Sequence, residues 1–320
     1  MDRIAVLTSG GDAPGMNACI RAVVRTALNY KMDIYGIERG YAGLIKGEIK
    51  RLESRSVSNM IHKGGTFLNT ARCDEFKDIE VQRQAVEALA AYGIEGLVVI
   101  GGDGTLRGAK DLSDNFGIKV MGIPGTIDND LAYTDYTVGF DTAVNTVLWA
   151  INNLRDTLHS HDRVGLLEVM GRNCGDIALH TGIAVGASVI LVPEVECSFE
   201  TIITKINAGQ RSGKKHFIIV VAEGVGGVEE LAKRIQEATG IETRASILGH
   251  VQRGGNPTTR DRVCASAMGA AAVKLLTQGI GNRVIALRDN KIVDFDIYEA
   301  LQMKKEFERD LLETALEIGI

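Results

Sequence analysis

Three clusters of glycine and acidic residues have the composition needed for phosphate chemistry. The first, GGDGT at 101–105, places one aspartate among three glycines directly after an apolar run at 97–100. Glycine lets backbone N–H groups approach a phosphate closely, and a carboxylate beside it can help to hold Mg²⁺. The alternative is a tight turn whose aspartate caps the next helix. The apolar run before the cluster favours a phosphate loop with Asp103 as a metal ligand.

The second cluster, PGTIDND at 124–130, offers a carboxylate for a different role. Asp128 and Asp130 stand two positions apart, so an extended backbone could direct both toward one side. Such a carboxylate can accept the proton of an alcohol that attacks phosphorus. An Asx turn with two solvated acids is the alternative. The third cluster, TSGGDAPGMN at 8–17, lies at the expected start of a helix. This helix start could bind an anion, or it could simply be well capped.

Basic residues that could neutralise an anion occur in several places. Arg21 and Arg25 lie one helical turn apart, and Lys214, Lys215 and His216 precede an apolar run. A solvated charged surface is the ordinary explanation for both groups. Elsewhere, loop arginines near glycine or histidine could clamp a phosphate. These are Arg72, Arg163, Arg172, Arg244 and Arg253.

Short apolar runs, which we interpret as strands, must position these clusters. Several of the runs are followed by the pattern of an amphipathic helix. The runs lie at 4–7, 97–100, 120–123, 164–169, 189–192, 217–222 and 283–287. Their near-continuous apolar character indicates mainly parallel sheets covered on both faces, which bind ligands at the carboxyl ends of the strands. We therefore expect an α/β protein with two similar three-layer α/β/α domains that face each other.

Composition restricts the cellular setting. The chain has 320 residues, of which 45% are hydrophobic, and this is enough for two domains. Its formal net charge of −5 disfavours nonspecific nucleic-acid binding. No window approaches the ~18 apolar residues of a membrane span, and we recognise no signal peptide. Five widely spaced cysteines without a CxxC pair suit reduced thiols. We predict a cytoplasmic protein without nucleic-acid or membrane partners.

Eight segments, taken in order, resemble bacterial ATP-dependent 6-phosphofructokinases, and the resemblance covers nearly the whole chain. They are 7–18, 64–73, 98–105, 124–130, 168–176, 222–226, 242–255 and 265–273. The resemblance implies the phosphofructokinase fold, with the active site in the cleft between two domains. It also implies the glycolytic transfer of a phosphoryl group from Mg-ATP to the 1-hydroxyl of fructose 6-phosphate.

Roles for individual residues follow from the resemblance alone. Asp128 would be the base and Arg172 would stabilise charge on the phosphoryl group, with Thr126 and Asp130 beside them. Mg²⁺ would be the cofactor, with Asp103 as its ligand. The further residues implied for ATP binding are Gly11, Arg72, Cys73, Gly102, Gly104 and Thr105.

The resemblance also implies a set of residues for the sugar phosphate. In the same subunit these are Thr126, Ile127, Asp128, Met170, Gly171, Arg172, Glu223, His250, Val251, Gln252 and Arg253. Arg163 and Arg244 would reach the 6-phosphate from a neighbouring subunit of a homotetramer. The family's domain boundaries predict a larger ATP domain at 1–139 plus 252–302. They predict a smaller fructose 6-phosphate domain at 140–251 plus 303–320.

An effector site for ADP and phosphoenolpyruvate is implied as well, but this chain departs from the family there. The implied residues are Arg21, Ala22, Val23, Val24, Arg25, Arg155, Lys214, Lys215 and His216. Ser188 stands where an acid normally helps to hold Mg²⁺, Ser212 replaces a usual cation, and Asn59 replaces a usual aspartate. Each charged contact typically contributes about 1–3 kcal/mol, so we predict weak allosteric control.

Three other functions remain as alternatives. Pyrophosphate-dependent relatives carry an aspartate and a lysine where this chain has Gly104 and Gly125, and both glycines favour ATP as the donor. NAD and lipid kinases resemble GGDGT but would not explain PGTIDND or the MGRNCGD segment at 170–176. A non-catalytic sugar-phosphate sensor would need neither an acid at Asp128 nor a metal ligand at Asp103.

Overall fold

The computed structural model describes residues 1–319, and their contacts divide the chain into two compact units, which are described separately. Unit 1 comprises Met1–Ile127, Leu131–Thr142 and Arg253–Lys305, and unit 2 comprises Asp128–Asp130, Ala143–Gln252 and the chain from Glu306 onward. The main crossings follow Thr142, Gln252 and Lys305, one to three residues after the positions expected from the family. The expected second domain also included Ile320, which lies outside the described residues.

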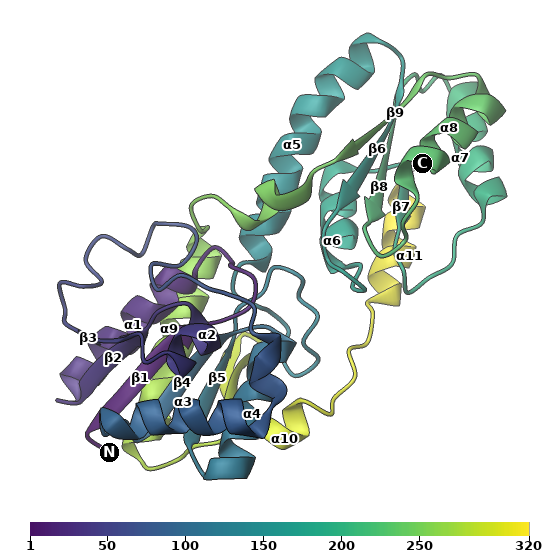
Figure 1. The fold of residues 1–320 in the computed structure, drawn as a ribbon. Coiled ribbons are helices and arrows are strands. Elements are labelled where there is room, and N and C mark those ends of the chain that lie inside the picture. The colour runs from purple at the N-terminus through teal and green to yellow at the C-terminus, as the bar shows by residue number, and fades with distance from the viewer. Residues whose placement is uncertain (320) are drawn as a thin grey trace. The chain divides into compact units, whose positions relative to one another are not determined.

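Unit 1 is built on one sheet of seven strands (Figure 1). The strands are β1 (Arg3–Thr8), β2 (Asp33–Ile37), β3 (Ile49–Leu52), β4 (Gly96–Gly101), β5 (Lys119–Pro124), β10 (Arg283–Arg288) and β11 (Lys291–Asp296). Their order is β11-β10-β5-β4-β1-β2-β3. The pairs from β10 to β2 are parallel, and β3 and β11 are antiparallel edge strands.

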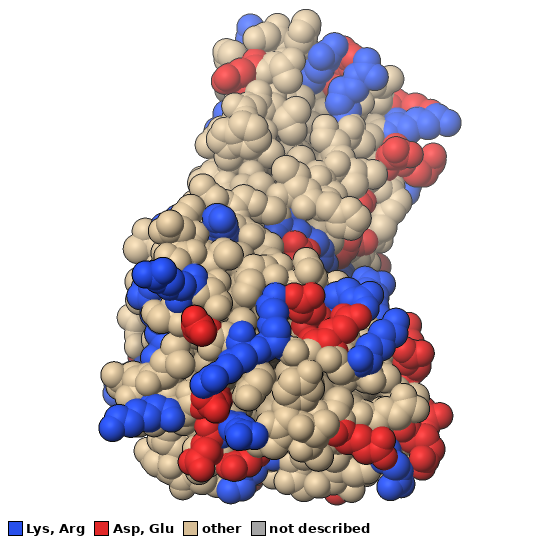
Figure 2. Space-filling view, turned by 60° about the vertical axis from the view of Figure 1, so that its left-hand side comes forward, with Lys and Arg blue, Asp and Glu red and all other residues tan. Residues whose placement is uncertain are grey.

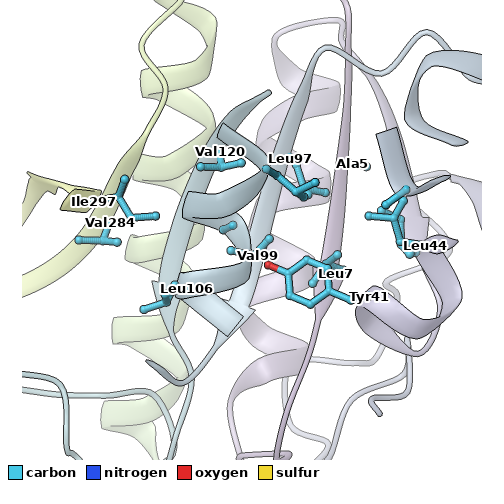
Figure 3. Packing of buried hydrophobic residues seen from close by; sticks show 14 of the residues in the cluster. Ala5, Leu7, Tyr41, Leu44, Leu97, Val99, Leu106, Val120, Val284 and Ile297 are labelled. Atoms are coloured by element: carbon cyan, nitrogen blue, oxygen red, sulfur yellow. The ribbon is translucent and has the colours of Figure 1, made fainter. Parts of the chain in front are cut away.

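Helices cover both faces of this sheet. They are α1 (Met16–Asn29), α2 (Gly40–Ile45), α3 (Ile79–Ala91), α4 (Asp103–Phe116), α9 (Thr259–Thr277) and α10 (Ile297–Ala300), with the short 3₁₀ helix η1 (Asp74–Lys77). On one face, Leu7 and Val99 pack against Tyr41 and Leu106 from the helices (Figure 3). Helices α1 and α9 pack together on the opposite face (Figure 1). Complete burial of each large apolar side chain contributes roughly 1.5–3 kcal/mol.

Unit 2 contains a smaller, wholly parallel sheet of four strands in the order β7-β8-β6-β9. The strands are β6 (Val164–Val169), β7 (Val189–Leu191), β8 (Phe217–Ala222) and β9 (Thr243–Ile247). Its helices are α5 (Phe140–Ser160, in unit 2 from Ala143), α6 (Asp176–Val185), α7 (Phe199–Arg211), α8 (Val228–Thr239) and α11 (Arg309–Ile318), and the 3₁₀ helix η2 (Gly249–Arg253) follows β9.

The helices of unit 2 again lie on both faces of its sheet. Ile202 and Ile206 of α7 and Ile235 of α8 share one apolar core with alternate residues of the strands. On the other face, α5 lies so close to β6 that a Cβ on Gly165 would be 2.4 Å from Cδ1 of Leu158. The prediction of an α/β fold with mainly parallel sheets is therefore confirmed.

Charged side chains of both signs occur on the side of the molecule drawn in Figure 2. Figure 2 shows lysine and arginine interspersed with aspartate and glutamate on that side. No helix within residues 1–319 is both long and apolar enough to cross a membrane.

Candidate active site

The GGDGT loop joins β4 to α4 at the carboxyl end of the unit 1 sheet. Gly101 is enclosed, because a Cβ there would lie 2.5 Å from both the Ser9 carbonyl oxygen and Thr105 Oγ1. Thr105 Oγ1 also donates to the Ser9 carbonyl at 3.0 Å, which ties the loop to β1. Gly104 is open, with no atom within 4 Å of a Cβ placed on it. The fold itself does not require glycine at 104, which leaves room there for a ligand.

Asp103 is the first residue of α4 and carries the carboxylate expected to bind a metal. Arg107 Nε donates to Asp103 Oδ2 at 2.7 Å, and this raises the pKa of Arg107. The described part of the chain contains no group of three or more His, Cys, Asp or Glu residues placed so that together they could hold a metal ion. Mg²⁺ commonly takes one or two carboxylates and completes its shell with phosphate oxygens and water. A single, partly exposed carboxylate beside three glycines therefore fits the prediction of a metal that arrives with a nucleotide.

The segment that carries Arg72 and Cys73, both predicted to bind ATP, is tied to the loop after β1 by side chains for which no role was predicted. Asn17 Nδ2 donates to the carbonyls of Lys63 and Gly64 at 3.2 and 3.0 Å, and its Oδ1 accepts from Phe67 N at 2.8 Å. Thr70 Oγ1 donates to the Gly10 carbonyl at 2.9 Å. The segment that carries Arg72 and Cys73 is thereby held next to the loop that carries Gly11. Burial raises the pKa of the Cys73 thiol, so this side chain is a neutral neighbour.

Three residues predicted for the sugar phosphate lie in unit 1. Arg253 Nη1 donates to the Asp12 carbonyl at 3.4 Å and would touch a Cβ on Gly11, so this guanidinium lies against the loop after β1. Thr126 is almost buried and its carbonyl accepts from Thr137 Oγ1 at 2.7 Å, whereas the side chain of Ile127 is wholly buried. The whole of Ile127, backbone included, is buried, so it offers no exposed atom to a ligand in this conformation.

Asp128 and Arg172 meet within unit 2. Arg172 Nε lies 3.3 Å from Asp128 Oδ2, and the Asp128 side chain is 2% exposed whereas that of Arg172 is 57% exposed. The next residue, Asn129, has a left-handed backbone with φ of 51° and donates from Nδ2 to Asp176 Oδ2 at 2.8 Å. Asp176, for which no role was predicted, therefore holds the acidic segment against the 170–176 loop.

Glu223 and Gln252, both predicted as sugar-phosphate ligands, hold the backbone of that loop. Glu223 Oε1 accepts from Gly171 N at 3.1 Å and from Arg172 N at 2.6 Å. Gln252 Oε1 accepts from Met170 N at 3.1 Å, and the Gln252 side chain is wholly buried. These bonds fix the start of the loop, and the exposed side chain of Arg172 projects from it.

Arg163 and Arg244 lie at the other end of the same strands. They share the carboxylate of Glu242, with Arg163 Nε 2.8 Å from Oε2 and Arg244 Nε 2.9 Å from Oε1, and these bonds lower the pKa of Glu242. Arg163 precedes β6, whereas Gly171 follows it; six residues of strand span about 20 Å. Within one copy of unit 2, these two arginines are therefore not brought together with the 170–176 loop.

The predicted effector residues are divided between the units. In α1, the pKa of Arg21 is lowered, first by partial burial and second by repulsion from the nearby positive charge of Arg25. Val23 and Val24 are wholly buried and Ala22 is 8% exposed, so their side chains offer a ligand little or no surface in this conformation.

In unit 2, a second set of cations gathers without an acid among the predicted effector residues. Burial and then Arg155 lower the pKa of Lys214, and burial, His159 and Arg155 lower that of His216. The Nδ1 atoms of His159 and His216 are 3.2 Å apart. Ser188 is 7% exposed, and its Oγ has no hydrogen-bond partner within residues 1–319.

The chain is an α/β protein of two units, each built on a mainly parallel sheet. Its glycine loops and the Asp128–Arg172 pair have the composition expected for binding phosphate ligands. The chain belongs to the phosphofructokinase family, whose model matches residues 3–276. The family resemblance drawn from the sequence is therefore confirmed.

Curated relatives match over almost their full length. The chain is 59% identical over 315 residues to ATP-dependent 6-phosphofructokinase 1 of Clostridium perfringens, and the match covers 98% of both. It is 58% identical over 316 residues to ATP-dependent 6-phosphofructokinase of Clostridium botulinum strain Alaska E43, again over 98% of both.

Solved structures share the fold. A phosphofructokinase from Saccharomyces cerevisiae has a TM-score of 0.89 at 33% identity; it matches 100% of this chain, which spans only about half (48%) of the yeast chain. A pyrophosphate-dependent phosphofructokinase from Marinobacter aquaeolei has a TM-score of 0.86 at 24% identity, over 99% of this chain and 92% of that one. At that identity the likeness shows the fold alone.

Proposed function

We propose that this chain transfers the γ-phosphoryl group of ATP to the 1-hydroxyl of fructose 6-phosphate, giving fructose 1,6-bisphosphate and ADP. The observation that carries the proposal is the buried Asp128 carboxylate, 3.3 Å from the guanidinium of Arg172. A carboxylate can take the proton of the attacking hydroxyl, and a cation next to it can neutralise charge on the group in transfer. A sensor of sugar phosphates would need neither.

Each residue contributes binding, orientation or proton transfer. Asp128 Oδ2 would accept the 1-hydroxyl proton while Arg172, whose side chain is mostly exposed, turns from Asp128 to the phosphoryl oxygens. Asp103 would hold Mg²⁺, which when bound neutralises phosphate charge. Because phosphoryl transfer depends mainly on positioning and charge, the hydrogen bonds that hold the loop at Gly171 support this reaction.

Assembly and location are further parts of the proposal. The Arg163–Glu242–Arg244 cluster lies about one strand length from the loop of its own copy, which favours its use by a neighbouring copy in a homotetramer. The phosphate would then replace Glu242 as the partner of both guanidinium groups. The five cysteines form no disulfide in the described residues, and we propose a cytoplasmic location.

A coupled assay with fructose 6-phosphate and Mg²⁺ tests the function directly. We expect turnover with ATP and none above background with pyrophosphate. A lack of turnover with ATP would refute the proposal, and turnover with pyrophosphate alone would favour the pyrophosphate-dependent alternative.

Donor choice can be tested separately at Gly104. The Gly104→Asp variant should fold normally, with Tm changed by less than about 3 °C, because a Cβ at this position meets no atom within 4 Å. The side chain would occupy space needed by the nucleotide, so we expect KM for ATP to rise at least about tenfold. An unchanged KM for ATP would show that Gly104 does not select the donor. As a steric control, Gly101→Ala should lower Tm because its Cβ would lie 2.5 Å from the Ser9 carbonyl oxygen.

Allosteric control is proposed to be weak. ADP and phosphoenolpyruvate are the expected effectors, but Ser188 and Ser212 supply neither the usual acid nor the usual cation. We expect near-hyperbolic dependence on fructose 6-phosphate, shifted little by either effector in rate measurements across substrate concentrations. A strongly sigmoidal curve that ADP converts to a hyperbola would contradict this expectation.

A further inference from the structure

A buried carboxylate in unit 1 has no part in the chemistry proposed above. Asp261, in the first turn of α9, is completely buried. Its Oδ1 accepts from Tyr136 Oη at 2.7 Å and from Gly139 N at 2.6 Å. Its Oδ2 accepts from Thr142 N at 2.9 Å and from the Thr142 hydroxyl. Burial raises the pKa of Asp261, whereas the hydrogen bonds from Thr142 and Tyr136 act in the opposite direction.

All four hydrogen bonds end on one short segment, residues 136–142, which we call the spacer segment. Thr142 Oγ1 also accepts from Thr258 N at 3.0 Å, so the start of α9 is joined to the segment a second time. Residues 131–135 separate the segment from the PGTIDND cluster, and its last three residues are the start of α5, which begins at Phe140. An isolated buried charge is costly, so a carboxylate at this place must be matched by its donors.

The spacer segment lies against two ligand loops of unit 1. Val138 N donates to the Pro124 carbonyl at 2.9 Å, and Thr137 Oγ1 donates to the Thr126 carbonyl at 2.7 Å. On the other side, a Cβ on Gly139 would lie 2.7 Å from the Cβ of Ala13. The segment thus separates the 13–15 loop from the 124–127 loop by a fixed layer of backbone.

We propose that Asp261 is a positioning residue, whose carboxylate fixes the spacer segment and thereby holds the 13–15 and 124–127 loops at the spacing that phosphoryl transfer requires. The inference rests on the proposed function, because it concerns the rate of that reaction. Asp261 touches neither reacting group; it acts through Val138 and Thr137 on the backbone that leads to Asp128.

The donor set makes asparagine an informative substitution. Each carboxylate oxygen of Asp261 faces one backbone N–H, from Gly139 or from Thr142, and a backbone N–H cannot reverse its direction. An asparagine of the same shape must therefore present its NH₂ group to one of them, leaving a buried donor without an acceptor. The hydroxyls of Tyr136 and Thr142 could rotate, but the backbone could not.

The test compares Asp261→Asn with the unsubstituted enzyme by two independent measurements. Without substrate, we expect hydrogen exchange of the Val138 amide to quicken at least about tenfold, because its segment has lost an anchor. In steady-state assays, we expect kcat to fall roughly 10- to 100-fold, with KM for ATP and for fructose 6-phosphate changed less than about threefold. Unchanged exchange at Val138, or an unchanged kcat per folded molecule, would overturn the proposal.

Leu89→Ala is the matched control for lost stability. Leu89 of α3 is 1% exposed, lies in the apolar core of the same unit, and has no side-chain group that can form a hydrogen bond. We expect it to lower Tm while leaving kcat and the Val138 exchange unchanged at temperatures where both variants are folded. An equal fall in kcat for Leu89→Ala would assign the effect of Asp261→Asn to stability alone and reject the positioning role.

A second variant keeps the proposal testable if Asp261→Asn does not fold. Thr142→Val removes one hydroxyl donor to Asp261 and the acceptor of Thr258 N, but keeps both backbone N–H bonds to Asp261. A smaller, about three- to tenfold, fall in kcat is therefore expected, with faster Val138 exchange. If neither quantity changes, the proposal fails. Absence of activity in the unsubstituted chain would instead refute the proposed function, whereas the exchange comparison would still report whether Asp261 anchors the segment.

Discussion

Replacement of Asp128 by asparagine is expected to lower kcat by roughly 10²- to 10⁴-fold, with KM for fructose 6-phosphate nearly unchanged. Asparagine keeps the shape of the side chain but cannot accept the 1-hydroxyl proton and hold it as a neutral acid. The loss corresponds to about 3–5 kcal/mol of transition-state stabilisation. Because the Asp128 side chain is only 2% exposed and contacts Arg172, the substitution also leaves that guanidinium without its anionic partner. Steady-state kinetics with a coupled assay measure both parameters.

Asp135→Asn is a suitable control for this experiment. Asp135 is also an aspartate paired with an arginine, Arg288, at 2.6 Å, but its side chain is 43% exposed and no reaction step uses it. Exposed ion pairs typically contribute about 0–1 kcal/mol, so we expect kcat and KM to stay within about twofold of the original values. A fall of less than about tenfold for Asp128→Asn would reject Asp128 as the base.

Replacement of Gly171 by alanine is expected to destabilise unit 2 by roughly 3 kcal/mol and to raise KM for fructose 6-phosphate markedly. Gly171 has φ of 134°, which side chains rarely adopt, and a Cβ would lie 2.4 Å from the Cys174 carbonyl oxygen. The loop must open to admit the methyl group, which would break the hydrogen bonds that Gly171 N and Arg172 N donate to Glu223. Thermal unfolding and steady-state kinetics report the two effects.

Gly240→Ala is a control that separates the effect of backbone strain from that of a steric clash. Gly240 ends α8 with φ of 70°, but no atom lies within 4 Å of a Cβ placed there. Strain alone costs about 1–2 kcal/mol, and we expect normal kinetics from this variant. If Gly171→Ala were no more harmful than Gly240→Ala, the close approach to Cys174 would have no functional importance.

Sequence reasoning located seven strands, including the edge strand β7, but missed β2, β3, β9 and β11, three of which lie at sheet edges. Strands such as β4 (GLVVIG) and β8 (FIIVVA) are buried on both faces, so their apolar runs are continuous and easy to recognise. The edge strands β3 (IKRL) and β9 (TRASI) are partly exposed and carry charged residues. Short polar strands have no periodicity that distinguishes them from loops, and only their partners in the sheet define them.

The candidate site shows a similar division. The glycine and acid clusters were recognisable because several unusual residues stand together in the sequence. Asn17, Asp176 and Asp261 were missed because each acts through hydrogen bonds to residues 46 or more positions away. Asn17 and Asp176 do lie inside glycine-rich motifs, which was the one available signal. Nothing near Asp261 in the sequence distinguishes it from an ordinary acid in the first turn of a helix.

The alternation of the two units along the chain has a consequence for synthesis on the ribosome. Strands β6 to β9 of unit 2 come from one continuous stretch within Ala143–Gln252, whereas unit 1 needs β10 and α9 from the stretch after Gln252 to complete its sheet and cover it. A chain is made from its N-terminus, and segments fold as their partners emerge. The sheet of unit 2, although encoded second, is therefore the first whose strands have all been synthesised. The sheet of unit 1 stays incomplete until the last quarter of the protein has been translated.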